Sequence, residues 1–262
     1  MKNLKKYGNS PFNIAVIHGG PGAAGEMATV ARKISAFQSV LEPLQTEDSL
    51  EGQITELKSV LLKQASLPVI LIGYSWGAWL IFILAARYPA LVKKLILVGS
   101  GPFEAKYAKN IMDTRLNRLN EKEKIEAQEL LKELGNSITK NKSALKKFGG
   151  LIEKADSFNL LPNDKEEVEI QQDIYQAVWP EASTLRKSGK LLELGKKIKC
   201  PVTAIHGNYD PHPANGVKEP LTKIIKNFKF ILLERCGHKT WVERFAKDKF
   251  YEILKNEFGI KM

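Results

Sequence analysis

The residues of this chain best suited to chemistry begin with a serine in a glycine-flanked turn. Residues 73–77, Gly-Tyr-Ser-Trp-Gly, lie between an apolar strand-like run at 67–72 and a helix-like run at 78–86. In that context G-x-S-x-G predicts a nucleophile elbow, a strained turn in which the glycines relieve crowding because they lack a Cβ. Such a turn lifts Ser75 Oγ out at the carboxyl end of a strand. The alternative is an ordinary small-residue turn, and the flanking runs favour the elbow.

A base and an orienting acid are expected at neighbouring strand ends. A serine hydroxyl needs a base to take its proton, and histidine suits this because its pKa lies near neutrality. His238 follows the last predicted strand, and Asp210 follows the strand before it. A carboxylate there would orient the imidazole; Glu104 is the alternative acid. Because such groups meet at the carboxyl ends of parallel strands, we predict a Ser75, Asp210, His238 set, rather than a surface histidine and a turn aspartate.

A glycine loop supplies the remaining part of this chemistry. Residues 18–22, His-Gly-Gly-Pro-Gly, follow the first predicted strand. The backbone N–H groups of Gly20 and Trp76 would form an oxyanion hole, each worth about 3–4 kcal/mol in the transition state. A phosphate cradle is the alternative, but the loop lacks the P-loop and dinucleotide fingerprints. We expect His18 to be structural, hydrogen-bonded within the loop.

Neither a metal site nor a disulfide is predicted. His206, Asp210 and His212 could act as metal ligands, but their spacing matches no familiar zinc pattern. Cys200 and Cys236 are too few and too unpatterned for a disulfide framework, and we expect both to be reduced. We therefore predict no cofactor.

The net charge of +11 raises nucleic acid and anionic membranes as partners. The excess of basic over acidic residues is +4, +3 and +4 over residues 1–102, 103–200 and 201–262, so no basic arm concentrates the charge. A lysine-rich solvated surface therefore explains the charge better than a nucleic-acid or membrane partner does. Residues 69–86 carry no charge, but their glycines split the run into strand, turn and helix, so we expect no membrane span. The basic N-terminus has no apolar stretch after it, and we expect no signal peptide and a cytoplasmic protein.

Strands alternate with helices along most of the chain, which predicts a mainly parallel sheet. The predicted strands are 12–17, 39–45, 67–72, 94–99, 201–205 and 228–233, and the predicted helices are 25–36, 50–65, 121–134, 165–178, 216–227 and 241–257. Residues 103–195 are charged and without strong strand signals. We therefore expect a core domain from 1–102 and 196–262, and a helical cap at 103–195.

These motifs together resemble the α/β-hydrolase superfamily over nearly the whole length. The nearest subgroup by motif is the proline iminopeptidases and related serine hydrolases, which share His-Gly-Gly-Pro-Gly at 18–22, Ser-Trp-Gly at 75–77 and Tyr-Asp-Pro at 209–211. The resemblance implies an α/β-hydrolase fold with an inserted cap, and it implies the roles already given to the serine, histidine, aspartate and oxyanion-hole residues.

Two departures limit this resemblance. The family usually carries Asp-x-Arg-Gly-x-Gly-x-Ser before the elbow, and residues 40–49 lack it. The chain also starts one strand before the oxyanion loop, so we expect the N-terminal hairpin to be missing and a sheet of about six strands. Iminopeptidases hold a substrate amine with cap carboxylates, and none can be singled out here.

The sequence thus predicts a serine hydrolase, carboxylesterase or aminopeptidase-like, that cleaves a small-molecule ester or amide through an acyl-enzyme on Ser75. One alternative is a lyase or C–C bond hydrolase with the same triad, because the substrate is chosen by the cap. Another is a non-catalytic ligand-binding protein of the same fold. A homodimer is compatible with the sequence, which leaves the oligomeric state open.

Overall fold

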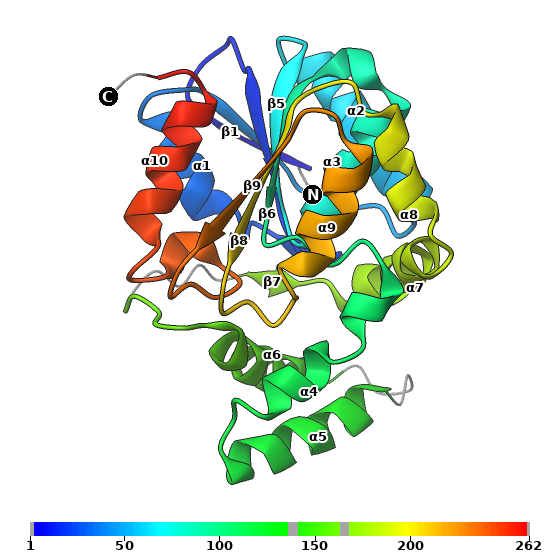
Figure 1. Ribbon diagram of the computed structural model, residues 1–262, viewed down its shortest axis with the longest axis vertical. Helices are drawn as coiled ribbons and strands as arrows, with labels where there is room; N and C mark the ends of the chain where they lie inside the picture. Colours follow the sequence, from blue (N-terminus) through cyan, green and yellow to red (C-terminus); the bar gives the residue numbers. More distant parts are fainter. Residues whose placement is uncertain (1–2, 136–140, 163–167, 261–262) are drawn as a thin grey trace.

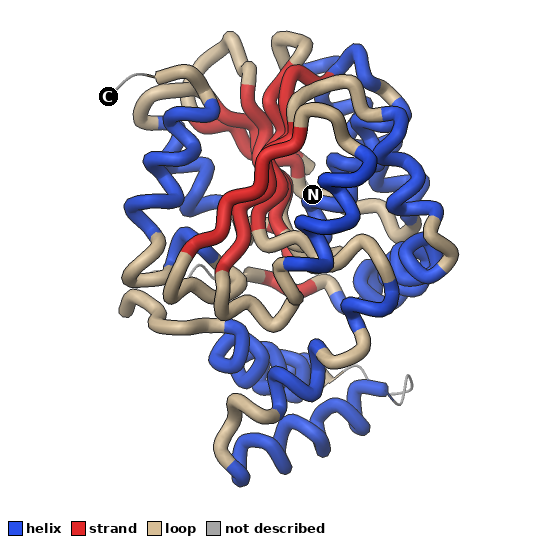
Figure 2. The backbone as a smooth tube through the Cα atoms, viewed as in Figure 1, coloured by secondary structure: helices blue, strands red, loops and turns tan. Residues whose placement is uncertain are grey.

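A computed structural model of the chain describes residues 3–135, 141–162 and 168–260. Its centre is a seven-stranded sheet with the strand order β1-β4-β2-β5-β6-β8-β9 (Figures 1 and 2). All neighbouring strands pair in parallel except β1, which is antiparallel to β4. The strands are β1 (Leu4–Tyr7), β2 (Ile14–Ile17), β4 (Val40–Pro43), β5 (Val69–Tyr74), β6 (Val92–Val98), β8 (Val202–Gly207) and β9 (Phe228–Leu233).

Helices cover both faces of the sheet, as the alternation of elements predicts. Helices α1 and α10 lie on one face, and α2, α3 and α9 lie on the other (Figure 1). The helices are α1 (Ala28–Ser35), α2 (Leu50–Gln64), α3 (Trp76–Arg87), α4 (Ile111–Leu116), α5 (Glu121–Gly135), α6 (Lys142–Asp156), α7 (Gln172–Lys187), α8 (Lys190–Glu193), α9 (Asn215–Ile224) and α10 (Lys247–Glu257).

The central strands are apolar throughout because both of their faces are buried. Side chains alternate along a strand, so Ile70 and Ile72 of β5 pack with α1 and α10, whereas Val69 and Leu71 pack with α2 and α3. Helix α3 is buried on nearly every side, which explains its uncharged sequence. The apolar run that contains β5 and α3 is therefore core, and no helix among the described residues is long and apolar enough to cross a bilayer.

The segment between β6 and β8 is mainly helical. Helices α4, α5 and α6 lie beyond the carboxyl ends of the strands (Figure 1) and share a small cluster of Leu119, Ala127 and Ala155. Helix α7 instead packs into the main core through Ile174 and Val178. This is the segment for which the sequence predicts a cap, and its division from the core at 103 and 195 stays a prediction.

The structure corrects the expected strand count. Leu4–Tyr7 forms a seventh strand, β1, so one antiparallel strand precedes β2, whereas the sequence predicts that the whole N-terminal hairpin is missing. Its two middle residues are exposed lysines, a composition typical of an edge strand and too polar for a hydrophobic pattern to reveal. A short pairing of β3 (Ala23–Ala24) with β7 (Glu169–Ile170) was also not expected.

Several helix boundaries also differ from the prediction, most of all at the starts of α7 and α10. The helix expected at 165–178 is α7, which begins at Gln172, and residues 163–167 lie outside the described residues. The helix expected at 241–257 begins at Lys247, and a short 3-10 turn, Thr240–Val242, precedes it.

Candidate active site

Ser75 occupies the turn between β5 and α3, where the sequence predicts the elbow. Its backbone has φ 51° and ψ −113°, a strained conformation for a residue with a Cβ. The glycines on either side are sterically required. A Cβ on Gly73 would lie 2.3 Å from the carbonyl oxygen of Gly77, and a Cβ on Gly77 would lie 2.4 Å from that of Ile17. The N–H of Ser75 donates to Val98 O at 2.9 Å, which ties the turn to the next strand.

The glycine loop lies beside this turn, and His18 shapes it. His18 is fully buried, and its Nε2 accepts from Gln45 N at 3.2 Å, so the proton is on Nδ1, which donates to Gly19 O at 2.9 Å. Burial lowers the pKa of His18, which keeps the ring neutral. Gly20 has φ +49°, a conformation that favours glycine. The structural role expected for His18 agrees with this bonding.

Trp76 begins helix α3, immediately after Ser75. The first N–H groups of a helix have no acceptor within the helix, so the backbone N–H of Trp76 is suited to an anion or an oxyanion. Its indole is buried, and Nε1 donates to Gln53 Oε1 at 3.0 Å and to Gln45 Oε1 at 3.2 Å. The side chain thereby fixes the start of the helix against α2 and the loop after β4.

His238 and Asp210 are brought together from the loops that follow β9 and β8. His238 Nδ1 donates to Asp210 Oδ2 at 2.7 Å, and both residues are buried. Burial alone would lower the pKa of His238, but the Asp210 carboxylate outweighs it, so this pKa is raised. Glu104, the alternative acid, lies 3.2 Å from Lys106 Nζ instead. The acid that reaches the imidazole is Asp210.

Two further histidines surround the same carboxylate. Asp210 Oδ1 accepts from His212 Nδ1 at 2.8 Å and from His212 N at 2.9 Å, and His206 Nε2 lies 3.4 Å from Oδ2. Burial alone would raise the pKa of Asp210, but the charges of the histidines hold it well below its usual range. The rings of His212 and His238 stack with centroids 4.5 Å apart. Burial lowers the pKa of His212 to about 4, so it is a neutral donor near pH 7.

The same cluster also has the residue types of a candidate metal site. Ligand atoms of Asp210, His212 and His238 lie within 4.8 Å of one another. However, each of the two Nδ1 atoms faces its own carboxylate oxygen at hydrogen-bond distance, which accounts for the cluster without a cation.

The loop that carries His238 is attached to the end of α6 and to the segment that follows it. His238 N donates to Asp156 O at 2.8 Å. Glu243 is fully buried, and its carboxylate accepts from Gly237 N at 3.0 Å, Phe158 N at 2.8 Å and Asn159 N at 2.7 Å. Three backbone donors from two segments therefore converge on one carboxylate. Sequence reasoning missed Glu243, because nothing local marks a glutamate in a loop as buried.

A cavity of about 530 Å³ joins these residues to the helical segment. Gly20, Tyr74, Ser75 and His238 line it from the sheet, and α4, α5, α6 and α7 line it from the other side. Its volume falls within the ~300–1,000 Å³ typical of small-molecule sites. The lining of one cavity therefore holds a partly exposed alcohol, a histidine with an acid partner, and the glycine loop at Gly20.

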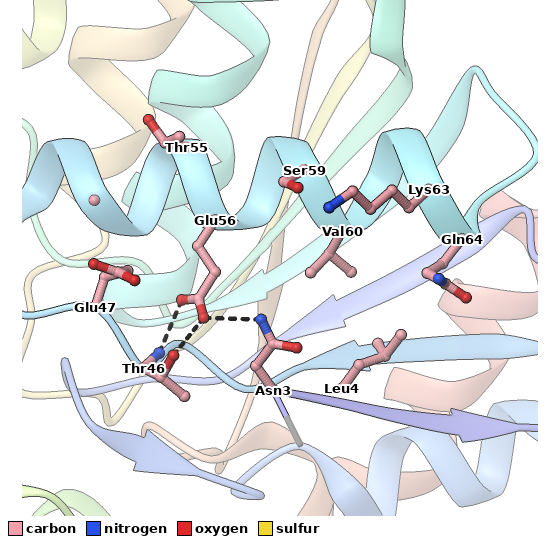
Figure 3. A pocket seen from close by; sticks show the side chains of 11 residues that line it. Asn3, Leu4, Thr46, Glu47, Thr55, Glu56, Ser59, Val60, Lys63 and Gln64 are labelled. Carbon is pink, nitrogen blue, oxygen red and sulfur yellow. Dashed lines mark hydrogen bonds between the residues drawn. The ribbon is translucent and has the colours of Figure 1, made fainter. Parts of the chain in front are cut away.

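A second cavity, of about 610 Å³, lies between α2, β1 and the loop after β4 (Figure 3). Its lining is mostly polar, and Ser75 is not part of it. Glu56 accepts there from Asn3 Nδ2 at 3.0 Å and from Thr46 N at 2.8 Å (Figure 3). This carboxylate joins the edge strand to α2, so we assign the second cavity a structural role, although it is the larger of the two.

Known proteins share the fold of this chain. A family model described as alpha/beta hydrolase fold matches residues 63–245. No curated protein sequence matches significantly. Among solved structures, VinJ superposes with a TM-score of 0.71 at 15% identity, covering 98% of this chain and 94% of VinJ. Proline iminopeptidase from Mycobacterium smegmatis superposes with a TM-score of 0.66 at 14% identity, covering 98% of this chain and 93% of that protein. The meta-cleavage product hydrolase from Pseudomonas fluorescens IP01 superposes with a TM-score of 0.65 at 18% identity, with the same two coverages. Identities this low show a shared fold alone.

Proposed function

The chain belongs to the α/β-hydrolase family, and on that premise we propose that it is a serine hydrolase that cleaves a small ester or amide through an acyl-enzyme on Ser75. The observation that carries the proposal is the 2.7 Å bond from His238 Nδ1 to Asp210. With the proton on Nδ1, the neutral ring has its lone pair on Nε2, which is the state a general base requires. Ser75 and His238 line the same cavity, which further supports this role.

The proposed reaction has two steps. Ser75 Oγ attacks the substrate carbonyl carbon as His238 Nε2 takes the hydroxyl proton, and the N–H groups of Gly20 and Trp76 stabilise the oxyanion. The tetrahedral intermediate collapses, His238 gives the proton to the leaving group, and an ester of Ser75 remains. Water then attacks this ester while His238 takes its proton, and the acid is released as Ser75 regains its hydrogen. Asp210 stabilises the imidazolium in both steps.

The same residues could also support C–C bond hydrolysis or a lyase reaction, because the triad does not choose the substrate. The non-catalytic alternative is less compatible with the site. A binding protein gains nothing from a nucleophile held at φ 51° or from a buried carboxylate paired with a partner imidazole. We assign helices α4 to α6 the role of the cap over this cavity.

Labelling with a fluorophosphonate probe tests the proposal. The wild type is expected to gain the mass of one adduct, mapped to Ser75 by peptide analysis, and Ser75→Ala is expected to gain none and to lose ester turnover on the order of 10⁶-fold. Ser157→Ala is the matched control, because Ser157 lines the same cavity but its Oγ donates to Glu153 O. Equal labelling of the wild type and Ser75→Ala would contradict the proposal.

A further inference from the structure

The charged side chains of the active-site cavity are paired with one another. Lys239 Nζ lies 3.0 Å from Glu26 Oε1 and 3.2 Å from Glu153 Oε1, and these carboxylates outweigh burial and raise the pKa of Lys239. Arg115 donates twice to Asp156, with both distances 2.7 Å. Each carboxylate among the described lining residues therefore already has a cationic partner. A substrate ammonium group would have to compete with Lys239 or Arg115 for carboxylates that these cations already hold, which is unfavourable where the pair is buried, as it is for Arg115 and Asp156.

The part of the cavity formed by the helical segment is apolar. The side chains involved come from α4, α5, α6, β7 and α7: Met112, Leu131, Leu134, Leu145, Phe148, Ile152, Ile170 and Tyr175. Leu131 and Ile170, which line the cavity, are 41% and 42% exposed, so part of this apolar surface is not covered by protein. Covering such apolar surface with an apolar ligand removes it from water, which stabilises the complex.

Helix α6 also leaves room for a ligand at Gly149. This glycine lines the cavity, and a Cβ built on it would meet only Ile170 Cδ1, at 3.9 Å. Its neighbour Gly150 is exposed, has nothing within 4 Å of a Cβ and does not line the cavity. The two positions therefore allow the same substitution inside and outside the cavity.

From these observations we propose that the substrate is an ester with a neutral, apolar acyl chain, rather than an aminoacyl compound. The inference rests on the proposed function. The acyl carbonyl lies at Ser75, and the chain extends between α5, α6 and α7, in contact with Leu131, Phe148 and Ile152. The carboxylates that border the reacting end are already engaged by Lys239 and Arg115, so an α-ammonium group would compete with these two cations. The site is thus an esterase site and not an aminopeptidase site.

A chain-length series tests this proposal. We expect kcat/KM for p-nitrophenyl esters to rise from acetate to hexanoate by tenfold or more, because each buried methylene contributes about fourfold. Methyl hexanoate and L-norleucine methyl ester share a six-carbon skeleton and a leaving group and differ in the α-ammonium. We expect the hexanoate to be preferred at least tenfold. A flat series, or a preference for the norleucine ester, would overturn the inference.

Two glycine variants locate the chain. In Gly149→Leu the new side chain occupies the cavity, so the ratio of octanoate to acetate turnover is expected to fall tenfold or more. Gly150→Leu changes the same helix outside the cavity, and its ratio is expected to match the wild type. An unchanged ratio in both variants, or an equal fall in both, refutes the placement.

The outcomes separate this inference from the proposed function. If a fluorophosphonate labels Ser75 and acetate is cleaved, but neither chain length nor the ammonium matters as stated, then only the acyl-chain inference fails. If Ser75 is not labelled and no ester is cleaved, the proposed function fails, and the inference fails with it.

Discussion

The most quantitative prediction concerns His212, which is buried and bonded to the same carboxylate as His238. Burial lowers the pKa of His212 to about 4 from 6.5, even though Asp210 opposes the change. The unfolded chain therefore binds a proton near pH 6.5, whereas the folded chain binds it only near pH 4. Between these values the unfolded state carries more protons, so stability falls as the pH falls. We expect His212→Phe to remove this part of the pH dependence while keeping a ring beside His238.

The magnitude follows from the two pKa values. At 1.36 kcal/mol per pKa unit, a lowering from 6.5 to about 4 corresponds in full to about 3 kcal/mol of folding free energy. According to the linkage relation, about 2 kcal/mol of this stability is lost when the pH is lowered from 7 to 5. The side chain is 14% exposed, so solvent screening reduces the value little. The wild type should therefore lose about 2 kcal/mol more than His212→Phe when the pH is lowered from 7 to 5.

Urea unfolding at pH 7 and pH 5 measures this difference. The variant is expected to be less stable than the wild type at pH 7, because it lacks the hydrogen bond to Asp210, so the informative quantity is the change of each protein with pH. A variant of His206 is the comparison for the same pH-dependent change in stability, since His206 Nε2 contacts the same carboxylate and the carbonyl of His212. If the wild type and His212→Phe lose the same stability between the two pH values, the assignment of His212 as a neutral donor is wrong.

Three further predictions concern the same loops. The kcat/KM of the wild type for an ester should rise with pH, with a midpoint above pH 6.5, because His238 must be neutral and Asp210 raises its pKa. In Asp210→Asn this acidic limb of the pH profile should move to lower pH, and kcat should fall by about 10⁴-fold. An acidic limb that is unchanged in the variant would contradict this. Glu243→Gln should lower the free energy of unfolding by about 1–3 kcal/mol, because the new amide NH₂ must face a backbone N–H. Urea unfolding measures this change, and a change below about 0.5 kcal/mol would refute the three-donor arrangement. Gly77→Ala should destabilise by about 1–3 kcal/mol and reduce fluorophosphonate labelling, because the new methyl meets the backbone of β2, and full labelling would argue against that close approach.

Much of the fold could be predicted because its signals are local. Apolar runs of the right length alternate with amphipathic segments, and this pattern alone indicates a parallel sheet covered by helices. The six predicted strands all occur, and α/β-hydrolase membership is confirmed by the family match. The missed strand β1 carries exposed lysines at an edge, where no burial pattern forms.

The candidate triad could be listed from the sequence because each member follows a recognisable strand. Ser75 lies in a motif that steric constraints nearly define, and His238 and Asp210 stand out as a histidine and an acid at strand ends. That the imidazole pairs with Asp210 and not with Glu104 depends on where the loops after β8 and β9 turn, and only the fold fixes this.

The sequence by itself determined the kind of chemistry that we propose, because a serine in a strained turn and the ends of parallel strands are short-range features. The tertiary structure alone decided the electrostatics around it. His212, Glu243 and Lys239 have no distinctive local pattern, and their partners lie on other segments. Charge pairing and burial depend on distances between segments far apart in the chain, and those distances exist only after folding.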